Sequence, residues 1–164
     1  MIADPFKAAL AFTLTWEGGL VEHPDDPGGL TNYGISQRAY PLEDIRNLSR
    51  ARVEQIYSED YWDKIEGDKL PPEVAFVLFD YAVHAGTKRA IRDLQTIVHA
   101  VSDGIMGAKT HHALSFFLVP YVVEQLLLAR GRLMVRLGQR EKYTPFLAGW
   151  INRLVANAAR WNIQ

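Results

Sequence analysis

The chain has 164 residues, 48% of them hydrophobic, and contains no cysteine. This length and composition predict one domain with a sizeable core, and they exclude a disulfide framework and a thiolate metal site. The net charge is −1, yet residues 1–80 carry 7 Lys and Arg against 15 Asp and Glu, whereas residues 81–164 carry 11 against 4.

The basic second half of the chain would suit an anionic envelope surface or nucleic acid. Its basic residues are spread over several predicted helices, and they form neither a recognition helix nor an aromatic platform. Solvated helix faces are the simpler interpretation. We therefore expect no nucleic-acid partner, and DNA binding is the least favoured function.

The first predicted element is an amphipathic helix that begins after Asp4. Asp4 is a typical N-cap and Pro5 suits the first helical position, while the Gly-Gly pair at Gly18 should end the helix. Glu17 is therefore expected in the last turn, where unpaired carbonyls carry negative partial charge. Together with the neighbouring Trp16, this position should raise the pKa of Glu17 towards that of a general acid.

A polar loop rich in Asp, Gly and Pro follows Glu17. Residues 20–21 and 33–35 are expected to pair as a minimal hairpin around this loop. The hairpin would hold a second carboxylate, Asp25 or Asp26, across a cleft from Glu17. Two carboxylates in unlike environments are the arrangement that glycosidic hydrolysis uses. The alternative is that Glu17 is simply a solvated residue at a frayed helix end.

The rest of the chain is predicted to be helical, with no repeat or low-complexity linker. Ser49 is expected to cap one helix, and Pro71-Pro72 should open another that Gly86 ends. Further helices are expected from Thr87, which would act as a cap, over about 108–118 and 120–138 after a turn at Asp103-Gly104, and from about Pro145 to Trp161. Because no linker precedes residue 102, the region after it should belong to the same fold.

Several segments together resemble the glycoside hydrolase family 108 N-acetylmuramidases, which include phage endolysins and bacterial proteins once called secretion activators. The N-terminal signature is carried by Glu17-Gly18-Gly19, Asp26-Pro27-Gly28-Gly29 and Thr31-Asn32-Tyr33-Gly34-Ile35. Three more segments fit the family: Tyr61-Trp62-Asp63, residues 79–86 (FDYAVHAG) and Gly149-Trp150-Ile151-Asn152-Arg153. Asp103-Gly104-Ile105-Met106-Gly107 with Thr110 looks like the DGxxGxxT turn of a peptidoglycan-binding region.

The resemblance implies a mainly α, lysozyme-like fold with a small β-hairpin next to the catalytic glutamate. We expect a single domain over 1–164, with a catalytic motif region at 1–101 and a peptidoglycan-binding-like helical region at 102–164 packed on it. The implied partner is a peptidoglycan glycan strand, and the implied activity is hydrolysis of the β-1,4 bond between N-acetylmuramic acid and N-acetylglucosamine. No cofactor is implied.

The spacing of the catalytic residues departs from that of the better-known phage lysozymes, in which eight residues separate Glu from Asp and five separate Asp from Thr. Here eight residues separate Glu17 from Asp26, but four separate Asp26 from Thr31. Asp25 fits the second spacing and not the first. The predicted catalytic residues are Glu17 as acid, Asp26 or less favourably Asp25 as its partner, and Thr31 to position water.

We predict that five residues bind substrate: Asp25, Asn32, Tyr33, Tyr81 and His84. His84 stands where the family pattern has Asn, and Tyr33 is favoured as a cleft residue because it lies near Thr31. Trp150 and Trp161 are interpreted as core. Asp80 is interpreted as a buried residue bonded to a neighbouring backbone group or a tyrosine.

No metal site is predicted, because adjacent His111 and His112 would point about 100° apart on a helix and there is no HExxH motif. Two further functions stay open. A lytic transglycosylase would use Glu17 alone, and a non-catalytic cell-wall-binding or secretion-assisting protein would keep the fold without turnover.

The N-terminus lacks the basic and apolar regions of a signal peptide. The most apolar stretch, residues 116–129, is too short and too interrupted to span a bilayer. We expect a monomer made in the cytoplasm without stable membrane insertion. It would act on peptidoglycan in the periplasm or cell wall after release by a holin or another export route.

Overall fold

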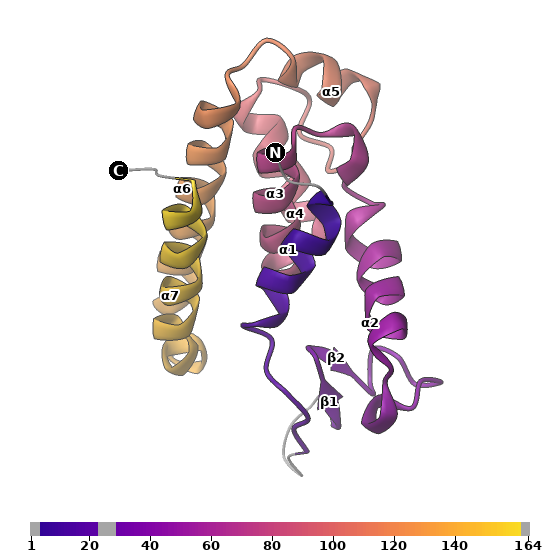
Figure 1. The fold of residues 1–164 in the computed structure, drawn as a ribbon. Coiled ribbons are helices and arrows are strands. Elements are labelled where there is room, and N and C mark those ends of the chain that lie inside the picture. Colours follow the sequence, from indigo (N-terminus) through magenta and orange to yellow (C-terminus); the bar gives the residue numbers. More distant parts are fainter. Residues whose placement is uncertain (1–3, 23–28, 162–164) are drawn as a thin grey trace.

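The computed structural model describes residues 4–22 and 29–161, and this part of the chain is mainly helical (Figure 1). The predicted mainly α class with a small β-hairpin is confirmed. Single turns of other helix types lie at Ile45–Asn47, Ser58–Trp62, Gly67–Lys69 and Glu141–Tyr143. The α-helices are α1 (Pro5–Leu14), α2 (Arg50–Tyr57), α3 (Pro72–Ala85), α4 (Thr87–Ile97), α5 (Ala108–Leu114), α6 (Val119–Gly138) and α7 (Thr144–Arg160), and the strands are β1 (Thr31–Asn32) and β2 (Ile35–Ser36).

Local signals set most helix ends where the sequence predicts them. The Asp4 carboxylate accepts a hydrogen bond from the Lys7 backbone N–H at 2.9 Å, which caps α1. The Ser49 hydroxyl caps α2 in the same way, 3.2 Å from the Arg52 N–H. Gly86, at φ +88°, ends α3 as predicted. It is also the N-cap residue of α4, so the prediction that Thr87 caps this helix is wrong; Thr87 is its first residue.

The hairpin has a different register from the predicted one. β1 and β2 are antiparallel, with Asn32 opposite Ile35 across a two-residue turn. Both turn residues, Tyr33 and Gly34, have positive φ (+51° and +74°), as a type I′ turn requires. Residues 20–21 do not pair with 33–35 as predicted; Val21 forms a single antiparallel bridge to β1 instead. The tight turn of the hairpin therefore lies at residues 33–34.

Helix α3 is the centre of the fold. Its nine consecutive residues Val74–Ala82 are all buried, because α1, α4 and α6 pack around it and α7 packs on α6. A helix buried on every side carries apolar residues on every side. Asp80 is the one charged residue in this stretch, so it needs partners from the surrounding helices.

The DGxxGxxT segment forms a closed turn between α4 and α5. The side chain of Gln95, 1% exposed, organises it. Its Nε2 lies 2.8 Å from Asp103 Oδ1, 3.0 Å from the Ile105 carbonyl and 3.1 Å from Thr110 Oγ1. Its Oε1 accepts a hydrogen bond from the Gly104 N–H at 2.8 Å. The polar groups of this motif are thus bonded to one another.

In the part of the chain that the structure describes, no single helix is both long and apolar enough to cross a membrane. Helices α5 and α6 meet that requirement of length and composition only as a pair, and they are bent by 113° where they join.

Candidate active site

Glu17 lies just beyond α1 and not in its last turn. The helix ends at Leu14 because the Thr15 hydroxyl donates to the Phe12 carbonyl at 2.7 Å, and the next backbone bonds are of the tighter i→i−3 type. The predicted position of Glu17 in the last turn of the helix is therefore wrong. Its carboxylate, 20% exposed, is held instead by an ion pair in which Arg153 Nη1 donates to Oε1 at 2.5 Å.

Arg153 lies on α7 and also contacts Asp80 on α3. Its Nε donates to Asp80 Oδ1 at 2.8 Å, and its Nη2 lies 2.6 Å from the same oxygen. The other Asp80 oxygen accepts from Arg130 of α6 and, at 3.0 Å, from Asn157 of α7, while the Thr13 hydroxyl of α1 donates to Oδ1 at 3.1 Å. One buried carboxylate thereby ties four helices together beside Glu17.

The predicted burial of Asp80 is confirmed, but its predicted partners were wrong, since two arginines and two neutral side chains hold it. Burial alone would raise the pKa of Asp80. The charges of Arg130 and Arg153 and their hydrogen bonds outweigh burial and lower the pKa to about 2. Asp80 is therefore an ionised anchor for Arg153 at neutral pH.

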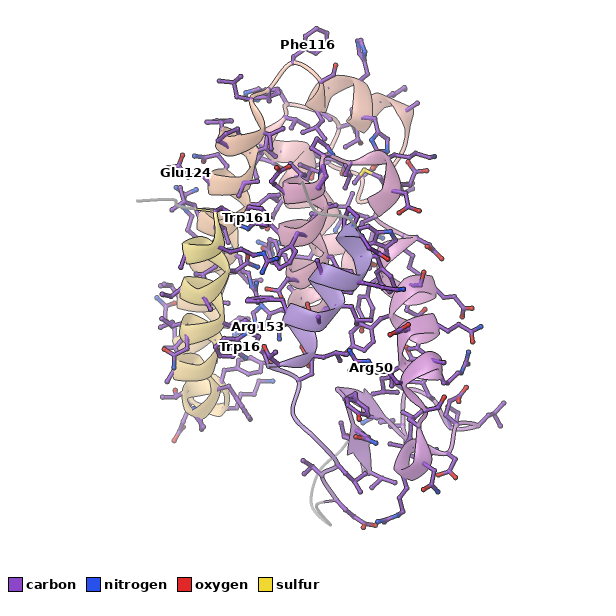
Figure 2. All side chains as sticks on the ribbon, in the orientation of Figure 1. Trp16, Arg50, Phe116, Glu124, Arg153 and Trp161 are labelled. Atoms are coloured by element: carbon purple, nitrogen blue, oxygen red, sulfur yellow. The ribbon has the colours of Figure 1, made fainter. Side chains whose placement is uncertain are left out.

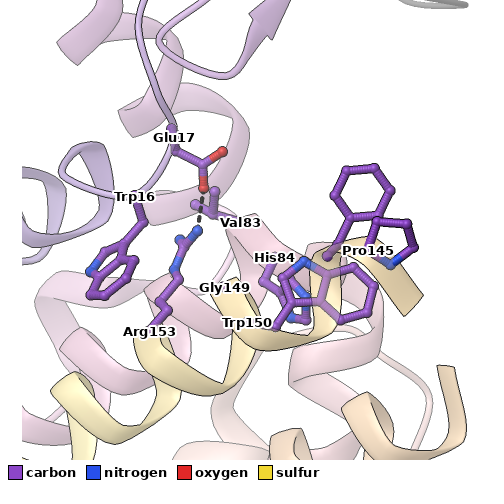
Figure 3. Close-up of a pocket in the computed structure, with 9 residues that line it drawn as sticks. Trp16, Glu17, Val83, His84, Pro145, Gly149, Trp150 and Arg153 are labelled. Carbon is purple, nitrogen blue, oxygen red and sulfur yellow. Dashed lines mark hydrogen bonds and ion pairs between the residues drawn. The ribbon is translucent and has the colours of Figure 1, made fainter. Parts of the chain in front are cut away.

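A cavity of about 400 Å³ opens beside the Glu17–Arg153 pair, within the size range of small-molecule sites (Figure 3). In Figure 3, Trp16 stands on one side of the pair and Trp150 on the other. Figure 2 places Trp16 and Arg153 between α1 and α7. The lining residues are Trp16, Glu17, Val83, His84, Pro145, Phe146, Gly149, Trp150 and Arg153.

His84 lines this cavity together with Trp150. The His84 ring meets Trp150 edge to face, with the centroids 5.0 Å apart. Burial and the positive charges of Arg130 and Arg153 lower the pKa of His84 to about 4, so its imidazole is neutral at pH 7. Trp150 is half-buried and lines the cavity, which corrects its assignment to the core; Trp161 packs against Phe76, with centroids 5.3 Å apart.

The hairpin turn at Tyr33–Gly34 lies against the Glu17 carboxylate. The Tyr57 hydroxyl of α2 donates to the Tyr33 carbonyl at 2.8 Å and so fixes the turn. Burial, and then the negative charge of Glu17, raise the pKa of Tyr57, which keeps this donor protonated. A Cβ added at Gly34 would lie 2.8 Å from Glu17 Oε2 and 3.0 Å from the Tyr57 hydroxyl oxygen. Glycine is therefore needed at this position for its size as well as for its positive φ.

Of the predicted substrate-binding residues that the structure describes, His84 is the one that lines the cavity with Glu17. Asn32 is 7% exposed, and its amide donates to the Ile45 carbonyl at 3.1 Å, so it supports the hairpin. Tyr81 is fully buried and its hydroxyl donates to Asp93 at 2.5 Å, so it does not reach a bound sugar. Both residues are corrected to structural roles.

Thr31 and Tyr33 lie in the hairpin but not in the lining of the cavity. The backbone of Thr31 pairs with Val21 through two hydrogen bonds of 2.8 and 2.9 Å. Tyr33 is half-buried and packs against the core. Asp25 and Asp26, the two candidates for the second carboxylate, lie outside the described residues.

Arg153, Phe146 and Gly149 line the site but were not predicted as site residues. The signal was present in the Gly149–Arg153 segment that fits the family pattern. Residues four apart on a helix share a face, so Gly149 and Arg153 both face the cavity from α7.

The two adjacent histidines point to different neighbours. His111 Nε2 lies 2.6 Å from Glu66 Oε2, and the His112 ring packs on Phe116 with centroids 5.0 Å apart. Over residues 4–22 and 29–161, no group of three His, Asp or Glu side chains is placed to hold a metal ion.

Comparison with known proteins divides the chain into two matched segments. Residues 10–86 match the family model described as glycosyl hydrolase 108, and residues 87–155 match a model described as a predicted peptidoglycan domain. The solved structure of Brucella abortus SagA is 33% identical to the chain, with a TM-score of 0.81. That similarity covers 95% of this chain and 92% of the SagA chain. A comparison with curated proteins gave no match.

Proposed function

Because the chain belongs to the glycosyl hydrolase 108 family, we propose that it hydrolyses the β-1,4 bond between N-acetylmuramic acid and N-acetylglucosamine. The family and the second matched region support a glycoside hydrolase that acts on peptidoglycan. The observation that carries the finer proposal is the Glu17 carboxylate, held by Arg153 at the wall of a cavity flanked by two tryptophans.

In the proposed reaction, the protonated Glu17 carboxyl gives its proton to the glycosidic oxygen as the bond to the sugar carbon breaks. The carboxylate left behind is the partner of Arg153, so the arginine stabilises the charge that develops during proton transfer. Asp80 fixes the guanidinium from its other side and makes this arrangement rigid before substrate binds. Water then attacks the oxocarbenium-like carbon and gives its proton to a carboxylate base, which completes hydrolysis.

Asp26 is the proposed partner of Glu17, as the group that stabilises the oxocarbenium-like state or activates the water, and Thr31 would position that water. Among the described residues lining the cavity, Glu17 is the one carboxylate. The second candidate function is that of a lytic transglycosylase, which the sequence leaves open because the identity of the second carboxylate is open there. Such an enzyme needs one residue that acts first as acid and then as base. A hydroxyl group of the sugar itself attacks the anomeric carbon in place of water.

The test is digestion of purified peptidoglycan, followed by mass analysis of the released fragments. Hydrolysis leaves reducing muramic acid ends, whereas transglycosylation leaves 1,6-anhydro ends that are lighter by one water. We expect reducing ends from the wild type, and a rate at least about 10²-fold lower from Glu17→Gln, which keeps the shape but cannot donate the proton. Anhydro ends would reject the hydrolase, and binding without release would indicate a wall-binding protein.

A further inference from the structure

The second matched segment, residues 87–155, matches a model described as a predicted peptidoglycan domain. Its residues line several cavities, and two of these lie at motifs singled out in the sequence. One of about 460 Å³ lies at the Asp103–Thr110 turn, and the other is the cavity beside Glu17, to which α7 contributes one wall. Figure 1 shows α5 at the opposite end of the molecule from the hairpin, and the two cavities share no lining residue.

The turn at Asp103–Thr110 is built as a structural joint. The amide of Gln95 is bonded to Asp103, Thr110 and two backbone groups of the turn. Asp103 Oδ1 also accepts from the Ile105 N–H at 2.9 Å, and this backbone hydrogen bond, followed by the one from Gln95, lowers the pKa of that carboxyl. These bonds explain the residue pattern of the motif without a ligand.

Helix α7 instead presents an aromatic surface to the cavity that holds Glu17. The rings of Phe146 and Trp150 are nearly parallel, at 21° with centroids 6.2 Å apart, and Phe146 is 57% exposed. Tyr143 and His84 pack against Trp150 from two further directions, with centroids 5.8 and 5.0 Å away. The Trp150 ring is therefore held in place while it borders open space.

Gly149 keeps this space open. It lines the cavity within α7, and a Cβ added there would meet nothing within 4 Å. Glycine in a helix interior is unfavourable by comparison with other residues, and here neither tight packing nor positive φ demands it. What a side chain at this position would do is fill the cavity.

We propose that the C-terminal segment recognises the glycan strand inside the catalytic cavity, with Phe146 and Trp150 as a platform for an N-acetylated sugar ring and Gly149 as its floor. The inference rests on the proposed function and extends it to a sugar-binding subsite. A pyranose ring has apolar C–H faces and a polar edge. The aromatic rings match the faces, and Arg153 lies in the same cavity to meet the edge.

The first experiment measures binding in the Glu17→Gln protein, whose turnover is expected to be at least about 10²-fold slower. The probes are chitotetraose and a soluble tetrasaccharide of alternating N-acetylglucosamine and N-acetylmuramic acid, titrated by calorimetry. Gly149→Leu should raise Kd at least about tenfold while Tm stays equal or rises. The matched control is Ala148→Leu, which adds similar bulk one exposed position away, about 100° around α7. It should leave Kd within about twofold.

The second experiment separates stacking from packing at Trp150. Trp150→Leu keeps an apolar side chain and should raise Kd about tenfold or more, whereas Trp150→Phe should restore most of the affinity because it restores a ring face. Unchanged binding in Gly149→Leu, equal effects of Leu and Phe at position 150, or no binding of either probe by the Glu17→Gln protein would overturn the platform. Failure of the proposed function shows separately, as wild-type protein that binds the tetrasaccharide but releases no fragments from peptidoglycan.

Discussion

Arg153 contacts two carboxylates with different atoms of one guanidinium. Nη1 reaches Glu17, while Nε and Nη2 face Asp80. A planar guanidinium can do this because its donors form a fixed fork, whereas the lysine ammonium is a single point charge. The orientation of Glu17 thus depends on the shape of its partner as well as on the charge.

Arg153→Lys tests this dependence on shape. The ammonium stays with one carboxylate and leaves the other without its donor, so we expect turnover to fall by about tenfold or more. The substrate KM should change less than kcat, because the aromatic rings on α7 are intact and the lysine ammonium can still donate to the polar edge of the sugar. Steady-state kinetics on soluble glycan, with circular dichroism as the folding control, provides the measurement. Equal kcat in the lysine variant would mean that charge alone suffices.

Gly34→Ala tests the closure of the hairpin on Glu17. The added methyl group would lie 2.8 Å from the Glu17 carboxylate, so the carboxylate must move. The positive φ of +74° adds a cost of about 1–2 kcal/mol for any L-residue with a Cβ. We expect a folded protein with a lower Tm and with turnover reduced by about tenfold or more. Unchanged turnover would show that Glu17 tolerates displacement.

At the scale of elements, helix starts were predictable and contacts between distant segments were not. The Asp4 and Ser49 caps and the proline that opens α3 act on their own helices, so the sequence around them is sufficient. The end of α1 and the hairpin register were missed. The end of α1 depends on the hydrogen bond from the Thr15 hydroxyl, and the hairpin register depends on the bridge from Val21 to Thr31. Other helix ends and other registers fit the local sequence equally well.

The same division holds for the site. Glu17 and His84 lie in short motifs whose residues are adjacent in the sequence, and they were predicted. The roles of Arg130 and Arg153 arise from the packing of α6 and α7 around α3, which the sequence does not specify locally. Trp150 was assigned to the core because an aromatic residue in a helical domain usually lies there; its place at a cavity depends on the open space at Gly149.

Helix α3 carries Asp80 and His84 one turn apart, and the histidine makes its packing sensitive to pH. The pKa of His84 in the fold is about 4, below the ordinary 6.5, so folding favours the neutral ring. This contribution to stability is fully present above pH 6.5 and is lost as pH falls towards 4. Between about pH 7 and 4.5 the loss amounts to roughly 2–3 kcal/mol.

His84→Asn removes this titration. We expect the free energy of unfolding of the wild type to fall more steeply than that of the variant between about pH 7 and 4.5, by roughly the same 2–3 kcal/mol. Urea unfolding at several pH values measures it. Parallel profiles would place the acid sensitivity elsewhere, for example in Asp60, Glu66 and Asp80, the carboxylates whose pKa values are lowered by their hydrogen-bonded or charged partners.

At the scale of the whole molecule, the acidic first half and the basic second half meet at the site. Arg130 and Arg153 come from the basic half, and Glu17 and Asp80 from the acidic half. His111 and Glu66 form a further contact between the halves, with their side-chain atoms 2.6 Å apart. Part of the charge asymmetry is therefore used inside the protein, and not only on solvated helix faces.

We predict that the two matched segments unfold together. Removing residues 87–164 would expose the faces of α3 that α4 and α6 cover, and would leave Asp80 buried without its arginines. Loss of one partner from a buried ion pair costs about 3–5 kcal/mol, a large part of the stability of a small domain. Fluorescence and far-UV circular dichroism should give coincident urea transitions for the full chain. Two separate transitions, or a folded fragment of residues 1–86, would contradict this prediction.

The Glu17–Arg153 pair also has a consequence in time. The two residues are 136 positions apart, so at about 5–20 residues per second the ribosome adds Arg153 roughly 7–27 s after Glu17. During that interval the nascent chain has neither the arginine that orients the proposed acid nor the α7 wall of the cavity. The proposed activity is therefore withheld until synthesis has passed α7, and a chain that stops early carries the acid without the means to use it.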